Sequence, residues 1–216
     1  MKNRIFLILF ILCSSALLFS QTDSVQYSRD YEFREGIYLT VEQFKADAPV
    51  TKQFIVTSIP KGELDFFYQL TEQKKITYTD KEGKEQTVQT SAIWGYCQNR
   101  SVYINMNNEF NKLNVIGAIC HFTASVRTTV GYRDPMSYSY GINNTVDEIR
   151  QFVLDTKTNK VYDFDVRNME MLLKSDPGLY NQFIMLKKRN KANSIFVYLR
   201  KYNEKHPLYF PHNEYY

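Results

Sequence analysis

The sequence predicts an α+β protein in which an antiparallel β-sheet precedes a helical C-terminal segment. Apolar and polar residues alternate with a period of two over residues 54–124, turn sequences separate the alternating runs, and the last third of the chain changes to helical spacing. The 17 Tyr and 15 Phe add residues that favour strands. We expect the strands to form a meander, with a small barrel of the SH3 type as the alternative.

The N-terminus has the composition of an export signal. Lys2 and Arg4 precede an apolar stretch at residues 5–19, and Ser20 supplies a small residue at its end. The stretch is shorter than the roughly 20 residues of a transmembrane helix. We therefore expect cleavage after Ser20, an exported protein in the periplasm or outside the cell, and no transmembrane segment after cleavage. An uncleaved anchor and lipid attachment at Cys13 are the alternatives.

The chain is expected to consist of three parts: a signal peptide at 1–20, a β-rich domain at 21–144, and a β-hairpin with C-terminal helices at 145–216. The formal net charge is +4, and removal of Lys2 and Arg4 with the leader lowers it to +2. A charge this small gives no indication of nucleic acid as a partner.

A short helix is expected at 41–47. Thr40 and Gln43 match a capping box, in which side chains at a helix start bond to free backbone N–H groups. In this helix Phe44 would point to one side, and Glu42, Lys45 and Asp47 to the other.

The central strands are separated by two tight turns. The expected strands are 54–58, 64–70, 75–79, 86–98, 101–106 and 113–124. Gly83 ends a hairpin turn that begins at Asp80, and Asn99-Arg100 forms the second turn.

Trp94 is the only tryptophan, and it lies on the strand before the second turn. Alternation places Trp94 and Tyr96 on one face and Ile93, Gly95 and Cys97 on the other. We interpret Trp94 as a packing residue or hairpin lid, and Gly95 as the position of a bulge or a close backbone approach.

Cys97 and Cys120 remain once the leader is removed. In a meander their strands lie two strand spacings apart, about 9.5 Å, which is beyond the reach of a disulfide. We expect two buried thiols; a disulfide would need another strand order or a closed barrel. A metal site that adds His121 lacks a CxxC or HxxxH pair. The apolar strand around His121 favours a core histidine with a hydrogen-bond partner.

Residues 123–148 are rich in Gly, Asn, Ser and Thr, which predicts a long loop or an edge hairpin. Exposed loops often carry binding function, so Tyr132, Tyr138 and Tyr140 are candidate binding residues, together with Trp94. A disordered connection between two halves of the chain is the alternative.

The C-terminal third is expected to begin with a hairpin and continue in helices. The hairpin strands are 149–154 and 160–164. The helices run from Val166 to Leu173, from Asp176-Pro177 onward, and over 192–204. The basic run KKRNK at 187–191 is interpreted as a solvated turn at a helix C-terminus, with a patch for an anionic partner as the alternative.

No motif in the sequence identifies an enzyme. GxSxG, HExxH, P-loop and GxGxxG patterns do not occur, so we assign no catalytic residue, cofactor or metal. Cys120 and His121 are strand neighbours that point to opposite faces, which leaves Cys97 with His121 as the conceivable nucleophile and base. A two-carboxylate hydrolase also stays open, because carboxylate separation is a property of the folded chain.

Two parts of the chain resemble an uncharacterised family of exported proteins from Gram-negative bacteria. The similarity lies in GIYLTVEQFKADAP and IWGYCQNRSVYI, and in QFVLDTKTNKVYDFDVRNMEMLLKSDPGLYNQF and LRKYNEKHP. The family has no assigned activity, so the resemblance implies an envelope or secreted location and no catalytic residues.

The leading hypothesis is a non-catalytic exported envelope protein that binds or supports an unknown surface component. The alternative is a small secreted hydrolase acting on envelope or carbohydrate material. The alternative predicts Cys97 close to His121 in an open cleft, or two facing carboxylates.

Overall fold

The computed structural model describes residues 23–131 and 143–212 and confirms the α+β class. The strands are β1 (Ser24–Gln26), β2 (Gly36–Tyr38), β3 (Ile55–Val56), β4 (Lys75–Thr79), β5 (Glu85–Gln89), β6 (Gly95–Gln98), β7 (Ser101–Met106), β8 (Glu109–Val115), β9 (Ile119–Gly131), β10 (Asn143–Asp155), β11 (Lys160–Asp163) and β12 (Tyr209–Pro211). The helices are α1 (Val41–Lys45), α2 (Phe66–Thr71), α3 (Val166–Leu173), α4 (Pro177–Ile184) and α5 (Lys188–Lys205), with short 3-10 turns η1 (Lys52–Phe54) and η2 (Thr90–Ala92). None of these helices is both long and apolar enough to cross a bilayer.

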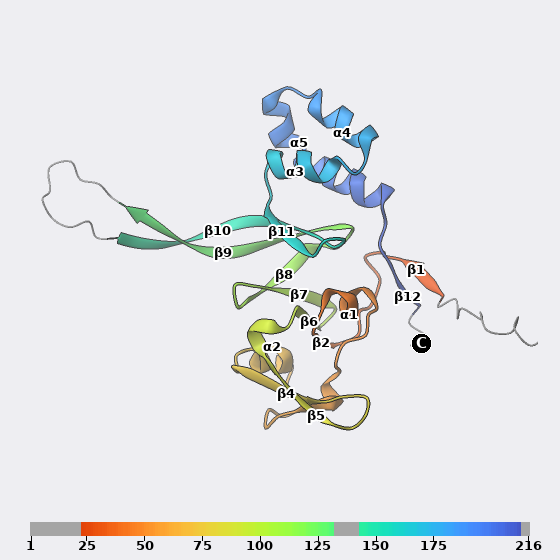
Figure 1. Cartoon of the computed structure of the whole chain (residues 1–216), viewed down its shortest axis with the longest axis vertical. Helices are drawn as coiled ribbons and strands as arrows, with labels where there is room; N and C mark the ends of the chain where they lie inside the picture. The colour runs from red at the N-terminus through yellow and green to blue at the C-terminus, as the bar shows by residue number, and fades with distance from the viewer. Residues whose placement is uncertain (1–22, 132–142, 213–216) are drawn as a thin grey trace, which may run out of the picture.

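An antiparallel sheet of seven strands runs through the middle of the molecule in the order β11-β10-β9-β8-β7-β6-β2 (Figure 1). Helices α3 to α5 lie at one end of the molecule, and α2 lies with the small β3-β4-β5 sheet at the other. The predicted meander is present from β6 to β9. The large sheet curls into a half-barrel, and β11 and β2 do not pair in the described structure, so the closed SH3-like alternative is not formed.

Three apolar cores hold the chain together. The central core is aromatic and joins α1, Trp94 and the terminal strands to the large sheet. A second core fills the space between the other face of β9 and β10 and helices α3 to α5. The third packs α2 and the small sheet against β2 and β6.

Helix α1 begins as predicted. The Thr40 hydroxyl accepts a hydrogen bond from the Gln43 backbone N–H at 3.3 Å, and the Gln43 side chain accepts one from the Leu39 N–H at 2.7 Å. Phe44 is buried, and Asp47, which was predicted to point to the other side of the helix, is buried as well. Asp47 follows the helix with φ at 42°, which turns its carboxylate inward.

The predicted strand at 64–70 is also wrong, because Phe66–Thr71 forms α2. Phe66 and Leu70 are four residues apart and share one face of a helix, and both are buried in the third core. In this short apolar run the helical spacing determines the fold.

The single strand predicted at 86–98 is interrupted by η2. The Asn105 side chain donates hydrogen bonds to three carbonyl groups of the interruption: those of Thr90, Ser91 and Ile93, at 3.3, 3.2 and 3.1 Å. Because of this break, side chains before and after η2 do not follow one continuous inward–outward alternation. Trp94 therefore shares the central core with Cys97, and the predicted grouping of Trp94 with Tyr96 is wrong.

The apolar run at 113–124 belongs to two strands, β8 and β9, with a bend between them. A Cβ atom on Gly117 would lie 2.3 Å from the Asn203 side chain, so a larger residue at this position would displace the Asn203 amide. The two predicted tight turns are confirmed: Asn99 and Arg100 both have positive φ, at 49° and 59°, and Gly83 has φ of 81°.

The C-terminal hairpin and helices are confirmed, with β10 starting at Asn143 rather than at 149. Asp176 caps α4 with Pro177 in its first turn. The interpretation of KKRNK as a turn at a helix C-terminus is wrong, because α5 starts at Lys188 and the basic run forms its N-terminal end.

Candidate functional site

Cys97 and Cys120 are free buried thiols, as expected. The Cys120 thiol donates to the Gly117 carbonyl at 3.3 Å, and Cys97 approaches the Phe33 carbonyl at 3.9 Å. Burial raises the pKa of each thiol to about 12. Both sulfurs are therefore held in the unreactive protonated form.

His121 is a core histidine, as predicted. Its ring lies between Phe164 and Phe196, with ring centroids 5.0 and 4.9 Å away, and its Nε2 atom shares a hydrogen bond with the Gln151 side chain at 3.0 Å. His121 faces the helical core, whereas Cys97 belongs to the central core on the other side of the sheet. The Cys97–His121 pair, one of the two arrangements that the hydrolase alternative predicts, is not formed.

The buried His121 ring should make the stability of the protein depend on pH. Burial lowers the pKa of His121 below its ordinary value of 6.5, and the bond to Gln151 offsets this only in part. The unfolded chain therefore binds more protons than the folded chain just below pH 6.5, so stability is complete above this pH and is lost as pH falls toward the folded pKa. In urea denaturation, the wild type should lose more stability between pH 7.5 and 5.5 than His121→Gln. Equal losses of stability in the two proteins would show that His121 does not cause the pH dependence.

Trp94 is buried in the central core. Its ring stacks on Phe44 at 4.6 Å between centroids, and its Nε1–H donates to the Asn159 side chain at 2.9 Å. A binding role for Trp94 stays a prediction. The other three candidate binding residues, Tyr132, Tyr138 and Tyr140, lie outside the described residues.

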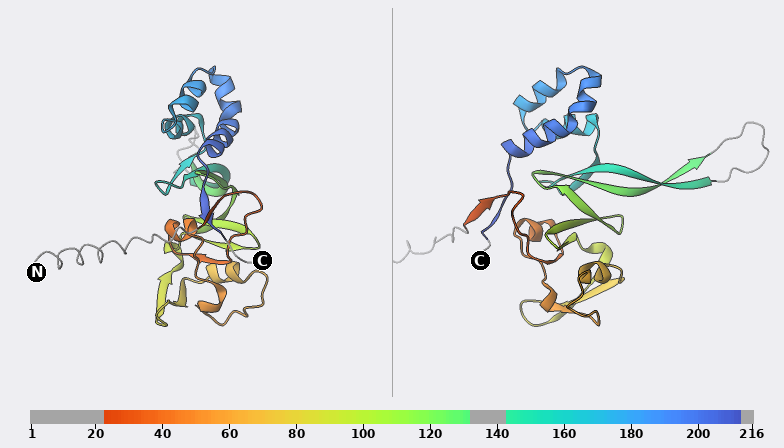
Figure 2. Two further views of the ribbon diagram at one scale, coloured as in Figure 1. Left: turned by 90° about the vertical axis from the view of Figure 1, so that its right-hand side faces the viewer. Right: turned by 180° about the vertical axis from the view of Figure 1, so that it is seen from behind.

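No group of three or more His, Cys, Asp or Glu side chains within residues 23–131 and 143–212 is arranged to hold a metal ion. The described feature that extends farthest from the three cores is the pair of strands β9 and β10, which projects sideways from the rest of the molecule (Figures 1 and 2). We call residues 123–131 and 143–151 the arm. The arm lies in the segment for which a loop or edge hairpin was predicted.

The arm is an antiparallel ribbon with a regular register. The ladder runs from Ile119 opposite Asp155 to Gly131 opposite Asn143 without a shift. β8 pairs with β9 only at its base, and the four-residue β11 pairs with β10 from Phe152 onward. Along most of the arm, both outer edges lack a strand partner among the described residues.

Exposed apolar side chains lie on both faces of the arm. Ile149 is 78 % exposed opposite Ser125, and Val146 is 50 % exposed opposite Thr128. The ion pair between Arg127 and Asp147, 3.2 Å long, is exposed to solvent and contributes little stability. At the base of the arm Ala124 is buried in the central core and Val126 packs against it. Beyond this base the arm is a two-stranded ribbon, and such ribbons are marginally stable in water when isolated.

A family model, described as a family of unknown function (DUF6563), matches residues 36–206. The chain belongs to this family. The DUF6563 match confirms the predicted resemblance to an uncharacterised family without an assigned activity. No curated protein matches the chain, and no solved structure matches it.

The matched DUF6563 region contains the whole arm, while the terminal strands β1 and β12 lie outside it. The sequence did not identify Val146 or Ile149 as surface features. Val146 precedes the strand that was predicted at 149–154, and Ile149 is its first residue. The β-branched residues in TASVRTTV and NNTVDEI were the available signal for strands there.

Proposed function

We propose that this member of the DUF6563 family is an exported, non-catalytic envelope protein that binds a partner protein through its arm. The observation that carries the proposal is the pair of open strand edges on the arm. An open edge presents unpaired backbone N–H and C=O groups, to which an extended segment of another chain can add as a strand. The packing roles of Cys97, Cys120 and His121 support a binding function over a thiol-based hydrolase.

The side chains beside the edge indicate what kind of segment would fit. Glu148 and the 78 % exposed Ile149 are neighbours on β10, so they point to opposite faces of the ribbon. A segment with a basic residue and an apolar residue at adjacent positions would meet a carboxylate on one face and an apolar surface on the other. We therefore propose an extended basic and apolar segment of an envelope protein as the partner.

The arm proposal is tested by capture from a solubilised envelope extract with immobilised residues 21–216. Replacement of 129–145 by Asn-Gly joins Thr128 to Val146, which are partners in the ladder, and shortens the arm with a hairpin turn. The shortened protein and Ile149→Lys should both lose the captured partner. Leu64→Lys, at an 84 % exposed site before α2, is the matched control and should keep it. Equal capture by the shortened protein would refute a role for the arm.

Export is tested separately on the protein from its native cells. We expect the mature chain to start at Gln21 and to fractionate with the periplasm or the medium. Intact-mass measurement distinguishes this from a chain that retains Met1, which would contradict export with signal cleavage.

A further inference from the structure

A groove of about 410 Å³ lies where the last turns of α5 meet the β8–β9 bend and the terminal strands β1 and β12. It is larger than two other hollows of the described structure, which measure about 310 and 330 Å³, and its volume is within the range of small-molecule sites, about 300–1,000 Å³. It lies apart from the arm and is not part of the function proposed above. We call it the α5 groove.

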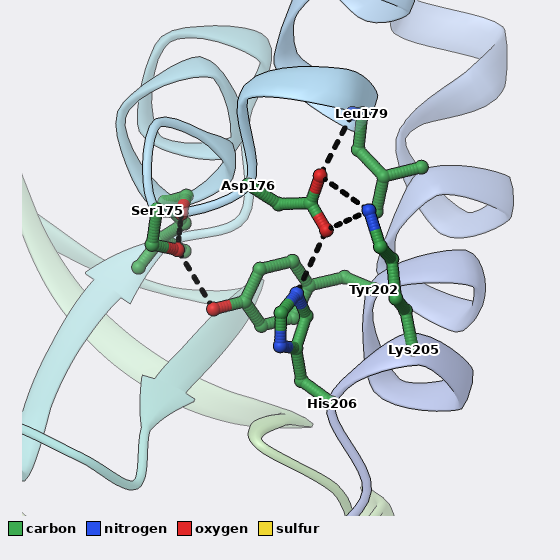
Figure 3. Close-up of polar contacts among 7 residues, drawn as sticks. Ser175, Asp176, Leu179, Tyr202, Lys205 and His206 are labelled. Atoms are coloured by element: carbon green, nitrogen blue, oxygen red, sulfur yellow. Dashed lines mark hydrogen bonds and ion pairs between the residues drawn. The ribbon is translucent and has the colours of Figure 1, made fainter.

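One wall of the α5 groove is held in place by a buried carboxylate. The Asp176 side chain is 2 % exposed, and it accepts hydrogen bonds from Lys205 Nζ at 2.8 Å and from His206 Nε2 at 2.8 Å (Figure 3). It also caps α4 through the Leu179 N–H at 3.1 Å. These bonds, led by that from Lys205, hold the pKa of Asp176 well below its usual range. The carboxylate therefore fixes the end of α5 against the start of α4.

The floor of the groove is fixed by Asn203, one turn earlier on α5. Its side chain accepts from the Ile119 N–H at 2.9 Å and donates to the Ile119 carbonyl at 2.8 Å. Gly117 leaves room for this amide. The groove is therefore formed before any ligand binds, which reduces the entropy lost on binding.

The polar groups of the groove are planar. They include the guanidinium groups of Arg29 and Arg200, the carboxylate of Glu204 and the amides of Gln26 and Asn114. None of the ion pairs in the described part of the chain involves either arginine. Two guanidinium groups for one carboxylate leave positive charge for a ligand, and a guanidinium matches a carboxylate with two parallel hydrogen bonds.

Apolar surface lies beside these groups, contributed by Tyr27, Ile116 and Leu208. A sugar ring carries hydroxyl groups around its edge and C–H groups on its faces. It therefore needs planar hydrogen-bonding side chains and an apolar surface in the same site. We propose that the α5 groove binds an acidic saccharide, with its carboxylate on Arg29 and Arg200 and a ring face on the apolar wall.

Calorimetric titration of residues 21–216 tests this proposal with three probes: trigalacturonate, neutral galactotriose and sodium phosphate. Trigalacturonate should bind, and Arg29→Gln and Arg200→Gln should each weaken its binding about tenfold, as expected for a charged hydrogen-bonded contact. Arg189→Gln, at the exposed start of α5, should change the affinity for trigalacturonate less than twofold. Circular dichroism of each variant checks that the fold is kept.

Four outcomes would overturn the proposal. Equal affinity for galactotriose would remove the requirement for an acidic group, and equal affinity for phosphate would remove the requirement for a sugar. No binding of trigalacturonate, or an equal loss in Arg189→Gln, would show that the groove is not the site. In NMR spectra, the Gly117 amide at the groove floor should shift with trigalacturonate and stay unchanged with the two other probes.

Discussion

Gly95→Ala is expected to destabilise the protein by about 3 kcal/mol, because overpacking against a backbone that cannot move aside is costly. The added Cβ would lie 2.1 Å from the Tyr103 carbonyl oxygen and 3.2 Å from its carbon. Both atoms belong to β7, which pairs with β6 on the opposite side of the hairpin. Relief would require the two strands to separate, and this would also pull apart the stacked rings of Tyr96 and Tyr103, whose centroids are 4.7 Å apart.

Chemical denaturation followed by Trp94 fluorescence measures this effect, since Trp94 is the only tryptophan and is buried next to Gly95. Gly62→Ala is the matched control. A Cβ at Gly62 would meet no atom within 4 Å, so its effect should stay within about 0.5 kcal/mol. A Gly95→Ala protein as stable as Gly62→Ala would mean that β6 and β7 are not packed as described.

Gly95 also shows which structural features a sequence can predict. A glycine inside a strand pattern indicates a close backbone approach, and this local signal was read correctly. The capping box at Thr40 and the turn at Asn99-Arg100 were equally local and equally reliable. Each depends on a few neighbouring residues, so distant contacts do not change the outcome.

Two of the failures concern longer patterns that a side chain from another element interrupts. Asn105 stabilises the break between β5 and β6 through three carbonyl groups, and Asn203 occupies the bend between β8 and β9. Asn203 is far in sequence from β8 and β9, and Asn105 lies on the next strand, β7, beyond the turn that follows β6. A period-two pattern alone therefore predicted two long strands where the protein has four.

The candidate sites were least accessible from sequence. The arm has open edges because β8 and β11 end early, which depends on the pairing of the whole sheet. The α5 groove combines residues from both ends of the chain, such as Arg29 and Arg200. Residue types alone gave no reason to place these two side chains together.

Asp47→Ala is the second substitution with a large expected effect. The Asp47 carboxylate is buried and accepts hydrogen bonds from the Arg34 N–H at 3.1 Å, the Tyr38 hydroxyl at 2.8 Å and the Tyr31 hydroxyl at 3.0 Å. Burial, reinforced by Asp47, raises the pKa of Tyr38 well above its usual range, so this hydroxyl stays a donor. Tyr31 also contacts the Pro211 carbonyl at 3.1 Å, which connects the network to β12.

The Asp47→Ala substitution would remove the acceptor for these donors. It would also place alanine, which tolerates a left-handed backbone less well than aspartate, at a φ of 42°. An unsatisfied buried donor costs about 1–3 kcal/mol, and the left-handed backbone adds about 1–2 kcal/mol. We expect a loss of about 3–4 kcal/mol for Asp47→Ala. Asp47→Asn keeps one acceptor oxygen and tolerates this backbone, so it should lose about half as much.

A double-mutant cycle with Tyr38→Phe separates the network from the backbone effect. If Asp47 and Tyr38 stabilise the fold through their mutual bond, the double variant should lose less stability than the two single losses combined, by about 1 kcal/mol or more. Tyr103→Phe, on a strand outside the Asp47 network, serves as the control partner and should combine with Asp47→Ala additively. Additive losses in both cycles would show that the bond between Asp47 and Tyr38 does not stabilise the fold. The coupling predicted here would instead make one buried carboxylate the connection between the end of α1 and the terminal strands that border the α5 groove.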